Sequence, residues 1–380
     1  MNKKIAGWIV TAAIVAVIVA VVVYREVGAP KPDSSISIGA ILPMTGNLAV
    51  LGQNEARLLQ ATEDVINEKR SNGSKIKIMI EDAAFDAKKA ASIANLFVSK
   101  DVPIIMISTT PLAAPVVPIA EQSGRLSVIH SMTEALLNDT RLALRIYPGI
   151  DDEVRTIGQW LRQQNEPTSI SVLRLDADWS AKWVDQFRAA YPDIPLQDET
   201  YTMQEINVRD ALAKVRAANL SHILLLGYGQ EYPSILRQIK EAQIDVPIVG
   251  NIGFAYAGTK EAAAGAQSQE LLTGCLFPFL ALDLKSKDFV TLNSKYREKF
   301  NADPLQEPGA LYFFDTVKLI LNAVDAVGVD PAKIKANILT EQNPYHGITG
   351  EITFSPNGNT TVALRMARYD KNGEIEFLKP

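Results

Sequence analysis

The sequence predicts an α/β protein made of two lobes, each a doubly wound parallel sheet covered by helices on both faces. Two observations predict this fold. Short β-branched runs alternate with amphipathic helices from residue 36 onward, and this alternation is typical of parallel sheets. The pattern pauses at RIYPGIDDE, residues 145–153, and then restarts. The restart indicates a second sheet in the same chain.

The composition indicates a globular protein and excludes several classes of partner. The chain has 380 residues, 47% of them hydrophobic and 21% charged, with a formal net charge of -5. This length suits one large or two ordinary domains. The charges are mixed along the chain, so no basic stripe is present and no nucleic acid partner is expected. Cys275 is the one cysteine; we interpret it as a small buried apolar residue.

The first residues predict a membrane anchor. Lys3 and Lys4 precede residues 5–24, which are apolar and carry no charge. As a helix these residues would be about 30 Å long, which matches the hydrocarbon core of a bilayer. The lysines place the main body outside the cytoplasm. We therefore expect residues 1–35 to be an uncleaved signal anchor and tether; a cleaved signal, which would release the protein, is the alternative.

The first series of elements begins at Ser37 with a strand, a polar loop that contains Gly46 and Gly52, and a helix. We expect the loop to form the rim of a cleft and its glycines to let the backbone approach a ligand. Amphipathic spacing predicts the helix that follows Asp86, with Asp86 as its N-cap. The next strands of this series are predicted at residues 75–80, 102–108 and 126–130.

The second series repeats this order and ends differently. Strands are predicted at 169–175, 222–226, 246–250 and 274–279, and helices at 178–191, 208–219, 232–243, 287–300, 309–328 and 330–339. Residues 350–378 instead alternate apolar and polar positions around SPNG and DKNG. Such turns predict antiparallel ribbons.

Four ordered stretches resemble a known family. They are IGAILPMTGNLAVLGQNEARLLQATEDVIN, EDAAFDAKKAASIANLFV, GRLSVIHSMTEALL leading to LRIYPGIDDE, and ILLLGYGQEYPSILRQIKEAQIDVPIVG. Over residues 36 to 370 the chain is similar to the type I periplasmic binding proteins, in particular the branched-chain amino-acid-binding family of ABC transporter receptors. The resemblance implies an extracytoplasmic protein that closes two lobes on a hinge over a small polar ligand and delivers it to permease subunits.

The resemblance also implies a division of the chain. The first lobe is expected to hold residues 36–148 and 254–346, and the second lobe residues 149–253 and 347–380. Three hinge crossings are expected near 147–150, 250–254 and 346–350. The family holds its ligand's carboxylate with hydroxyls and backbone N–H groups of first-lobe loops and covers the ligand from the second lobe. The matching positions here are Leu51, Thr109, Thr110, Ser131, Met132, Thr133, Trp179, Tyr228, Asn251 and Ile252.

Two departures from the family bear on the ligand. Amino-acid binders pair the ligand's ammonium with an acidic residue where this chain has Ile252, and a buried ammonium without a carboxylate is strongly disfavoured. A carboxylate or amide-like ligand is therefore expected rather than a free α-amino acid, with Asn251 able to supply a hydrogen bond. The family's first-lobe disulfide is also missing, with Phe85 and Thr109 at about those positions.

Other classes of function find little support in the sequence. No nucleophile elbow, phosphate-binding loop or complete dinucleotide fingerprint is present, so no enzyme activity, catalytic residue or cofactor is expected. No cluster has metal-ligand spacing, so no metal site is expected. We interpret His130 as structural rather than as a ligand contact. A sensory ectodomain that works with a separate signalling partner remains the alternative to transport.

Overall fold

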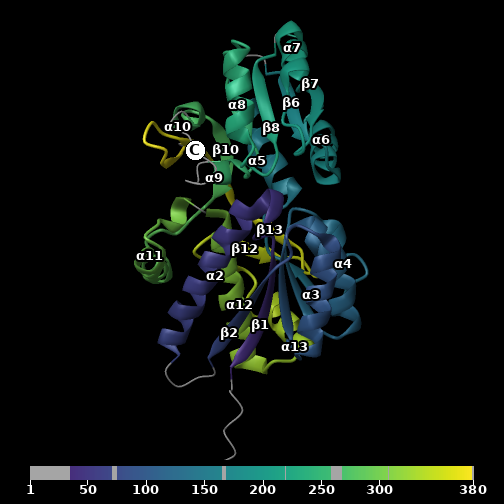
Figure 1. The fold of residues 1–380 in the computed structure, drawn as a ribbon, viewed down its shortest axis with the longest axis vertical. Helices are drawn as coiled ribbons and strands as arrows, with labels where there is room; N and C mark the ends of the chain where they lie inside the picture. Colours follow the sequence, from purple (N-terminus) through teal and green to yellow (C-terminus); the bar gives the residue numbers. More distant parts are fainter. Residues whose placement is uncertain are drawn as a thin grey trace, which may run out of the picture.

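The computed structural model describes residues 35–70, 75–164, 168–218, 220–257, 268–306 and 308–378. Within these ranges the chain forms two stacked lobes (Figure 1). The anchor expected at residues 5–24 lies outside the described residues. Among the helices that the structure describes, none combines the length and the apolar character needed to cross a membrane.

The first lobe contains a five-stranded parallel sheet in the order β2-β1-β3-β4-β5. Its strands are β1 (Ile36–Leu42), β2 (Ile76–Asp82), β3 (Ile104–Ser108), β4 (Leu126–His130) and β5 (Ala143–Arg145). One face packs on α3 (Ala87–Ser99) and α4 (Thr110–Gln122). The other packs on α2 (Ala49–Lys69), α11 (Lys287–Phe300), α12 (Leu311–Val327) and α13 (Pro331–Thr340).

The second lobe contains a seven-stranded sheet in the order β15-β14-β10-β9-β8-β6-β7. Its strands are β6 (Ile170–Leu175), β7 (Leu196–Tyr201), β8 (His222–Leu226), β9 (Ile248–Gly250), β10 (Leu276–Leu280), β14 (Leu364–Tyr369) and β15 (Ile375–Phe377). On one face lie α5 (Ile150–Arg162) and α6 (Asp178–Ala190). On the other lie α7 (Arg209–Ala218), α8 (Tyr232–Glu241), α9 (Phe254–Ala257) and α10 (Ser268–Leu272).

The second sheet is parallel from β7 through β10, as expected, and ends in an antiparallel edge. Strand β14 runs antiparallel to both β10 and β15. The antiparallel ribbons expected from the SPNG and DKNG turns are confirmed, since these turns join β12 to β13 and β14 to β15. A third, three-stranded sheet holds β11 (Tyr345–Gly347), β12 (Gly350–Phe354) and β13 (Thr360–Val362).

Strand pairing and packing show that two segments belong to the opposite lobe from the one expected from the sequence. Strand β10, assigned to the first lobe from the sequence, pairs with β9 and β14 of the second sheet. Conversely, residues of β12 and β13, assigned to the second lobe, pack into the core of the first. An apolar run has the same pattern in either sheet, so periodicity cannot tell which sheet it joins.

The same pairing corrects two of the three expected crossings. The chain leaves the first lobe between Arg145 and Ile150, as expected. It returns between the end of β10 and the start of α11 rather than at 250–254, and crosses last at Ala363 rather than at 346–350. The last two crossings touch, because the N–H of Ala281 donates to the carbonyl of Ala363 at 3.4 Å.

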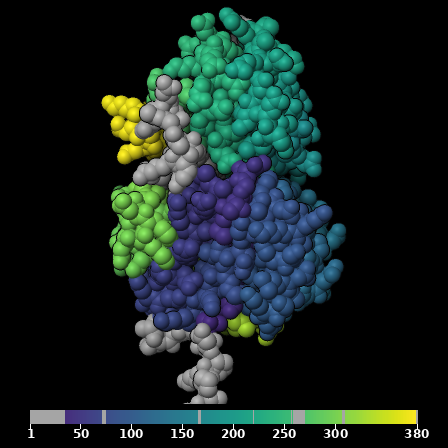
Figure 2. All heavy atoms as spheres, in the orientation of Figure 1, coloured from purple at the N-terminus to yellow at the C-terminus, as the bar shows by residue number. Residues whose placement is uncertain are grey.

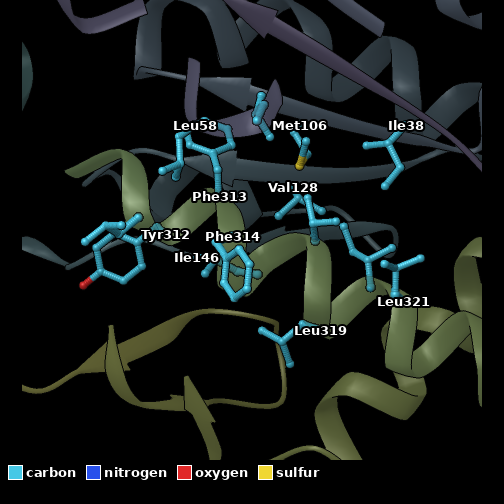
Figure 3. Packing of buried hydrophobic residues seen from close by; sticks show 14 of the residues in the cluster. Ile38, Leu58, Met106, Val128, Ile146, Tyr312, Phe313, Phe314, Leu319 and Leu321 are labelled. Carbon is cyan, nitrogen blue, oxygen red and sulfur yellow. The ribbon is translucent and has the colours of Figure 1, made fainter. Parts of the chain in front are cut away.

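The core of the first lobe is built around α12. This helix is apolar on most sides and is buried accordingly. Figure 3 shows Phe313 and Phe314 of α12 gathered with Met106 and Val128 from the sheet. In the second lobe Cys275 is buried and unpaired, as its interpretation required, and burial raises the pKa of its thiol to about 12.

Candidate functional site

A cavity lies between the lobes at the carboxyl ends of β3, β4, β8 and β9, and it occupies about 580 Å³ including its open mouth. Carboxyl ends of parallel strands are where doubly wound folds place ligands. Figure 2 shows the lobes meeting beside this region. The cavity is lined by Leu51, Glu55, Ser108, Thr109, Thr110, His130, Ser131, Met132, Tyr147, Trp179, Gly227, Tyr228, Asn251, Ile252 and Gly253.

Every predicted site residue except Thr133 lines this cavity. Thr133 lies one layer behind, where its hydroxyl accepts from Thr110 Oγ1 at 3.1 Å. Thr110 Oγ1 also lies 2.5 Å from Ser131 Oγ, which in turn accepts from the N–H of Thr133 at 3.2 Å. The start of α4 and the end of β4 thus share a connected cluster of hydroxyls at the floor of the cleft.

Thr109 holds a conformation that is unusual for its type. Its φ is 67° and its ψ is 150°, although β-branched residues rarely adopt positive φ. Its N–H donates to the carbonyl of His130 at 2.9 Å, and its own carbonyl accepts from Ala113 at 3.1 Å. Within the described ranges its buried Oγ1 has no hydrogen-bond partner. Such strain is concentrated at binding sites.

Glu55 is buried in α2, one turn beyond Leu51, and brings a carboxyl group into the cleft. Its Oε1 accepts from Ser108 Oγ at 2.8 Å. Its Oε2 is buried and finds no partner in the part of the chain that the structure describes. Burial raises the pKa of this carboxyl to about 8, against the lowering effect of the Ser108 hydrogen bond. At neutral pH the group is therefore protonated in the free protein.

His130 has a structural role and also lines the cavity. Its ring stacks on Phe313 at 3.9 Å, and its Nε2 lies 2.9 Å from Thr316 Oγ1. A hydrogen bond with the backbone of Ile107 acts on the same ring. Burial lowers the pKa of the imidazole to about 3, so the ring is neutral. His130 thus makes structural contacts, as interpreted from the sequence, and its side chain also lines the cavity.

Aromatic side chains close the cleft from the second lobe. Trp179 lies in the first turn of α6, with its ring 5.9 Å from that of Tyr228. The Tyr228 ring also meets Phe85 of the first lobe edge-on at 6.1 Å. Close by, Gln230 donates to the carbonyl of Asn47 across the same gap. In this arrangement Tyr228 contacts both lobes.

Asn251 and Ile252 follow β9 and face the cavity with groups that are already engaged. Asn251 Oδ1 accepts from Tyr232 at 2.5 Å, and its Nδ2 donates to the carbonyl of Gly227 at 3.0 Å. The N–H of Ile252 donates to the buried Glu153 at 2.9 Å. Ile252 itself presents an apolar side chain at this position, so it supplies no counter-charge.

The sequence comparison identifies the family. Residues 35–374 match the sequence model of the family described as periplasmic binding protein. The chain belongs to this family. Membership implies an extracytoplasmic location, and the family is one of solute-binding proteins rather than enzymes.

Relatives of this periplasmic binding protein are distant in sequence and close in fold. A Leu/Ile/Val-binding protein homolog from Brucella abortus is 21% identical over 343 residues, which is 88% of this chain and 90% of that protein. The branched-chain amino acid transporter substrate-binding protein of Streptococcus pneumoniae, solved with isoleucine, superposes with a TM-score of 0.80 at 23% identity, covering 91% of this chain and 100% of that one.

A third similar protein holds a different kind of ligand. A solute-binding protein of an ABC transporter from R. palustris, solved in complex with benzoate, gives a TM-score of 0.75 at 15% identity. The match covers 90% of this chain and 95% of that one. At these identities the structures establish the shared fold and leave the ligand of this periplasmic binding protein to be argued from its own residues.

The sequence reasoning missed several lining residues of this binding protein: Glu55, Ser108, Tyr147, Gly227 and Gly253. Glu55 could have been found, because residues four apart share one face of a helix and Leu51 was already chosen. The loop glycines have another role than expected. Neither Gly46 nor Gly52 lines the cavity; a Cβ at Gly52 would lie 2.4 Å from the backbone of Pro43. Gly52 lets the loop fold back onto α2.

Proposed function

We propose that this chain is the extracytoplasmic solute-binding component of an ABC importer. It takes a small polar ligand into the cleft between its lobes, closes over the ligand and delivers it unaltered to permease subunits. Membership of the family supports the solute-binding role, and the position of the cavity between two lobes supports hinge closure.

One observation carries the proposal. Glu55 and Thr109 both line the cavity, and each has a buried side-chain oxygen, Oε2 and Oγ1, without a partner among the described residues. Leaving such atoms unpaired costs about 1–3 kcal/mol each. Both residues face one space between the lobes, and a polar ligand there would satisfy these oxygens.

We further propose a carboxylate or amide-like ligand rather than a free α-amino acid. The hydroxyls of Thr110 and Ser131 lie at the start of α4, where the helix dipole favours an anion. Among the residues that line the described cavity, none is Lys or Arg. Hydroxyls and helix N–H groups can hold a carboxylate without a full counter-charge.

A ligand panel tests this proposal. Purified protein is screened by thermal shift against leucine, isoleucine, 4-methylpentanoate, benzoate and benzamide, and each hit is measured by calorimetry. A ligand at 100 times its Kd stabilises the native state by about 2.7 kcal/mol. We expect carboxylates or amides to raise the melting temperature most. Tighter binding of leucine than of 4-methylpentanoate, which is leucine without its amino group, would contradict the proposed ligand class.

A further inference from the structure

The buried carboxyl of Glu55 is the one acidic group that lines the cleft within the described part of the chain. Resting on the ligand-binding function above, we propose that Glu55 meets the ligand as a neutral carboxylic acid and donates a hydrogen bond to a ligand oxygen. This donation makes the cleft select carboxylates and amides over compounds that carry an ammonium group.

The geometry leaves one carboxyl oxygen of Glu55 for the ligand. Ser108 Oγ donates to Oε1 at 2.8 Å. The other oxygen, Oε2, is buried and has no hydrogen-bond partner in the part of the chain that the structure describes. Ser108 directly precedes Thr109 and Thr110, whose hydroxyls line the same cavity. The unpartnered oxygen therefore lies next to the start of α4, where an anionic group of a ligand is favoured.

The charge state of Glu55 decides what can bind beside it. A neutral carboxyl group has one O–H donor, whereas an ionised one accepts only. Burial raises the pKa of Glu55 to about 8, so the donor is present at neutral pH. A ligand carboxylate would be repelled by an ionised Glu55, but it accepts a strong charge-assisted hydrogen bond from the neutral acid.

The titratable neighbours in the cleft do not replace this proton. His130 is neutral because burial lowers its pKa to about 3, and burial raises the pKa of Tyr228 above its ordinary value. Tyr147 also lines the cavity. Arg57 lies two residues along α2 from Glu55, and residues at that spacing do not face each other on a helix.

On the helices packed against α2, the charged side chains named below have partners other than Glu55. On α12, Asp315 accepts from the N–H groups of Ile348 and Thr349, and burial raises the pKa of Tyr312 well above its ordinary value. On α11, Lys295 and Lys299 pair with Glu68 and Asp64 at 2.7 Å each. Among the described residues that line the cavity, Glu55 is thus the acid whose pKa lies between pH 6 and 9. Glu153, whose pKa is also raised to about 8, lies behind the lining and accepts from the N–H of Ile252.

Calorimetry of the full chain with two probes, 4-methylpentanoate and leucine, tests the proposal between pH 6.5 and 9. Wild type is expected to bind 4-methylpentanoate about tenfold more weakly at pH 9 than at pH 7, because Glu55 loses its donor proton near pH 8. E55Q keeps an N–H donor that does not titrate, so its affinity should stay flat over this range. D315N alters another buried carboxyl of raised pKa that does not line the cavity and whose donors, Ile348 and Thr349, do not line it either, and should keep the wild-type pH dependence.

Infrared difference spectra of wild type and E55Q provide a readout that needs no ligand. At pH 6.5 the wild type should show the carbonyl band of one more protonated carboxyl than E55Q, and this band should fade above pH 8. Absence of the band overturns the proposal.

The outcomes separate this proposal from the proposed function. Affinity for 4-methylpentanoate that is independent of pH in wild type overturns the role of Glu55 and leaves solute binding intact. Leucine binding that strengthens as pH rises and is lost in E55Q also overturns it, since an ionised Glu55 would then be pairing an ammonium group. A wild type that binds neither probe at pH 6.5 counts against both this proposal and the ligand class proposed above.

Discussion

At the scale of single residues, the cleft is defined by polar atoms that are buried before any ligand arrives. Thr109 adds backbone strain to a buried hydroxyl, and that hydroxyl and Glu55 Oε2 have no hydrogen-bond partner in the described chain. Native proteins leave few such atoms. The two on Glu55 and Thr109 belong to residues that line one cavity, which favours a binding site between the lobes.

The hydroxyl cluster gives the first residue-scale prediction. Replacing Thr110 with Val removes the hydroxyl that contacts Ser131 and Thr133 and lines the cavity. We expect the affinity for the best ligand of the panel to fall about tenfold. One hydrogen bond to the ligand, worth about 1 kcal/mol, is lost, and the hydroxyls of Ser131 and Thr133 also lose a partner. Calorimetry measures it.

Thr140→Val is the matched control, because its hydroxyl donates to the carbonyl of Leu137 and lies outside the cavity. Equal affinities of the two variants would contradict a ligand role for Thr110.

The two buried glutamates predict how stability depends on pH. Burial raises the pKa of Glu55 and of Glu153 from 4.5 to about 8. Between these values the folded chain holds protons that the unfolded chain releases, so each group lowers the free energy of unfolding as pH rises. The slope is at most about 1.4 kcal/mol per pH unit for each group.

Relative to wild type, E55Q should therefore gain stability progressively from pH 5 to pH 8. Urea unfolding at each pH measures this difference. Stability curves that run parallel for the two proteins over this range would show that Glu55 is not buried as a neutral acid.

The residue scale also shows what could be read from sequence. The predicted hydroxyls and aromatics, Thr133 excepted, line the cavity, because strand ends and helix starts fix where such side chains lie. Glu55 was not predicted because the family's acid stands at the position of Ile252, on another element. A carboxyl group can enter the cleft from another element, and matching the family position by position does not find it.

At the scale of elements, strand β5 holds the first hinge crossing through one buried cation. Arg145 Nη1 donates to the carbonyls of Ser131 and Tyr147 at 3.0 and 2.5 Å. Its Nη2 donates to the carbonyl of Thr360 at 3.0 Å, and its Nε to Asn359 Oδ1 at 2.6 Å. Burial lowers the pKa of this guanidinium to about 10, so it stays charged at neutral pH. One side chain thus ties the crossing to the cleft and to the third sheet.

Replacing Arg145 with Met should lower the free energy of unfolding by about 3 kcal/mol, because several buried acceptors lose a charged donor together. Urea denaturation measures the loss. Arg155→Met is the control, since Arg155 pairs with Asp152 near the same crossing but is partly exposed. Its removal should cost less than about 1 kcal/mol. Similar losses in the two variants would contradict the anchoring role of Arg145.

Whether a segment forms a helix or a strand was largely predictable from the sequence, whereas the sheet that each strand joins was not. Strands β1, β3 and β4 of the first sheet are mostly apolar runs, and turn residues marked the hairpins of the tail. The crossings at Ala281 and Ala363 carry no comparable signal, because small residues between two apolar runs are equally common within a lobe. Strand β7, with its half-exposed pattern, also lacked the apolar run on which strand prediction depends.

At the scale of the whole molecule, the lobes touch across the cleft mouth. Tyr228 of the second lobe packs on Phe85 of the first, and Gln230 reaches Asn47. These contacts form only when the lobes are together, so they favour the closed state. A ligand that contacts both lobes adds to the same preference.

The contact between Phe85 and Tyr228 predicts a coupling that is specific to closure. Tyr228→Ala should weaken ligand binding about tenfold, since it removes an aromatic pair and a lining side chain. Phe85→Ala, which does not line the cavity, should weaken binding less. The binding free energy lost in the double variant should be smaller than the sum of the losses in the two single variants. Strict additivity in calorimetric affinities would show that the pair does not contribute to the closed state.

The most direct test of the account is small-angle X-ray scattering on the free protein and on the complex with the best ligand of the panel. We expect ligand to lower the radius of gyration until the scattering curve matches the structure described above, with the lobes in contact. A radius of gyration that stays unchanged at ligand saturation would contradict closure of the two lobes over the ligand.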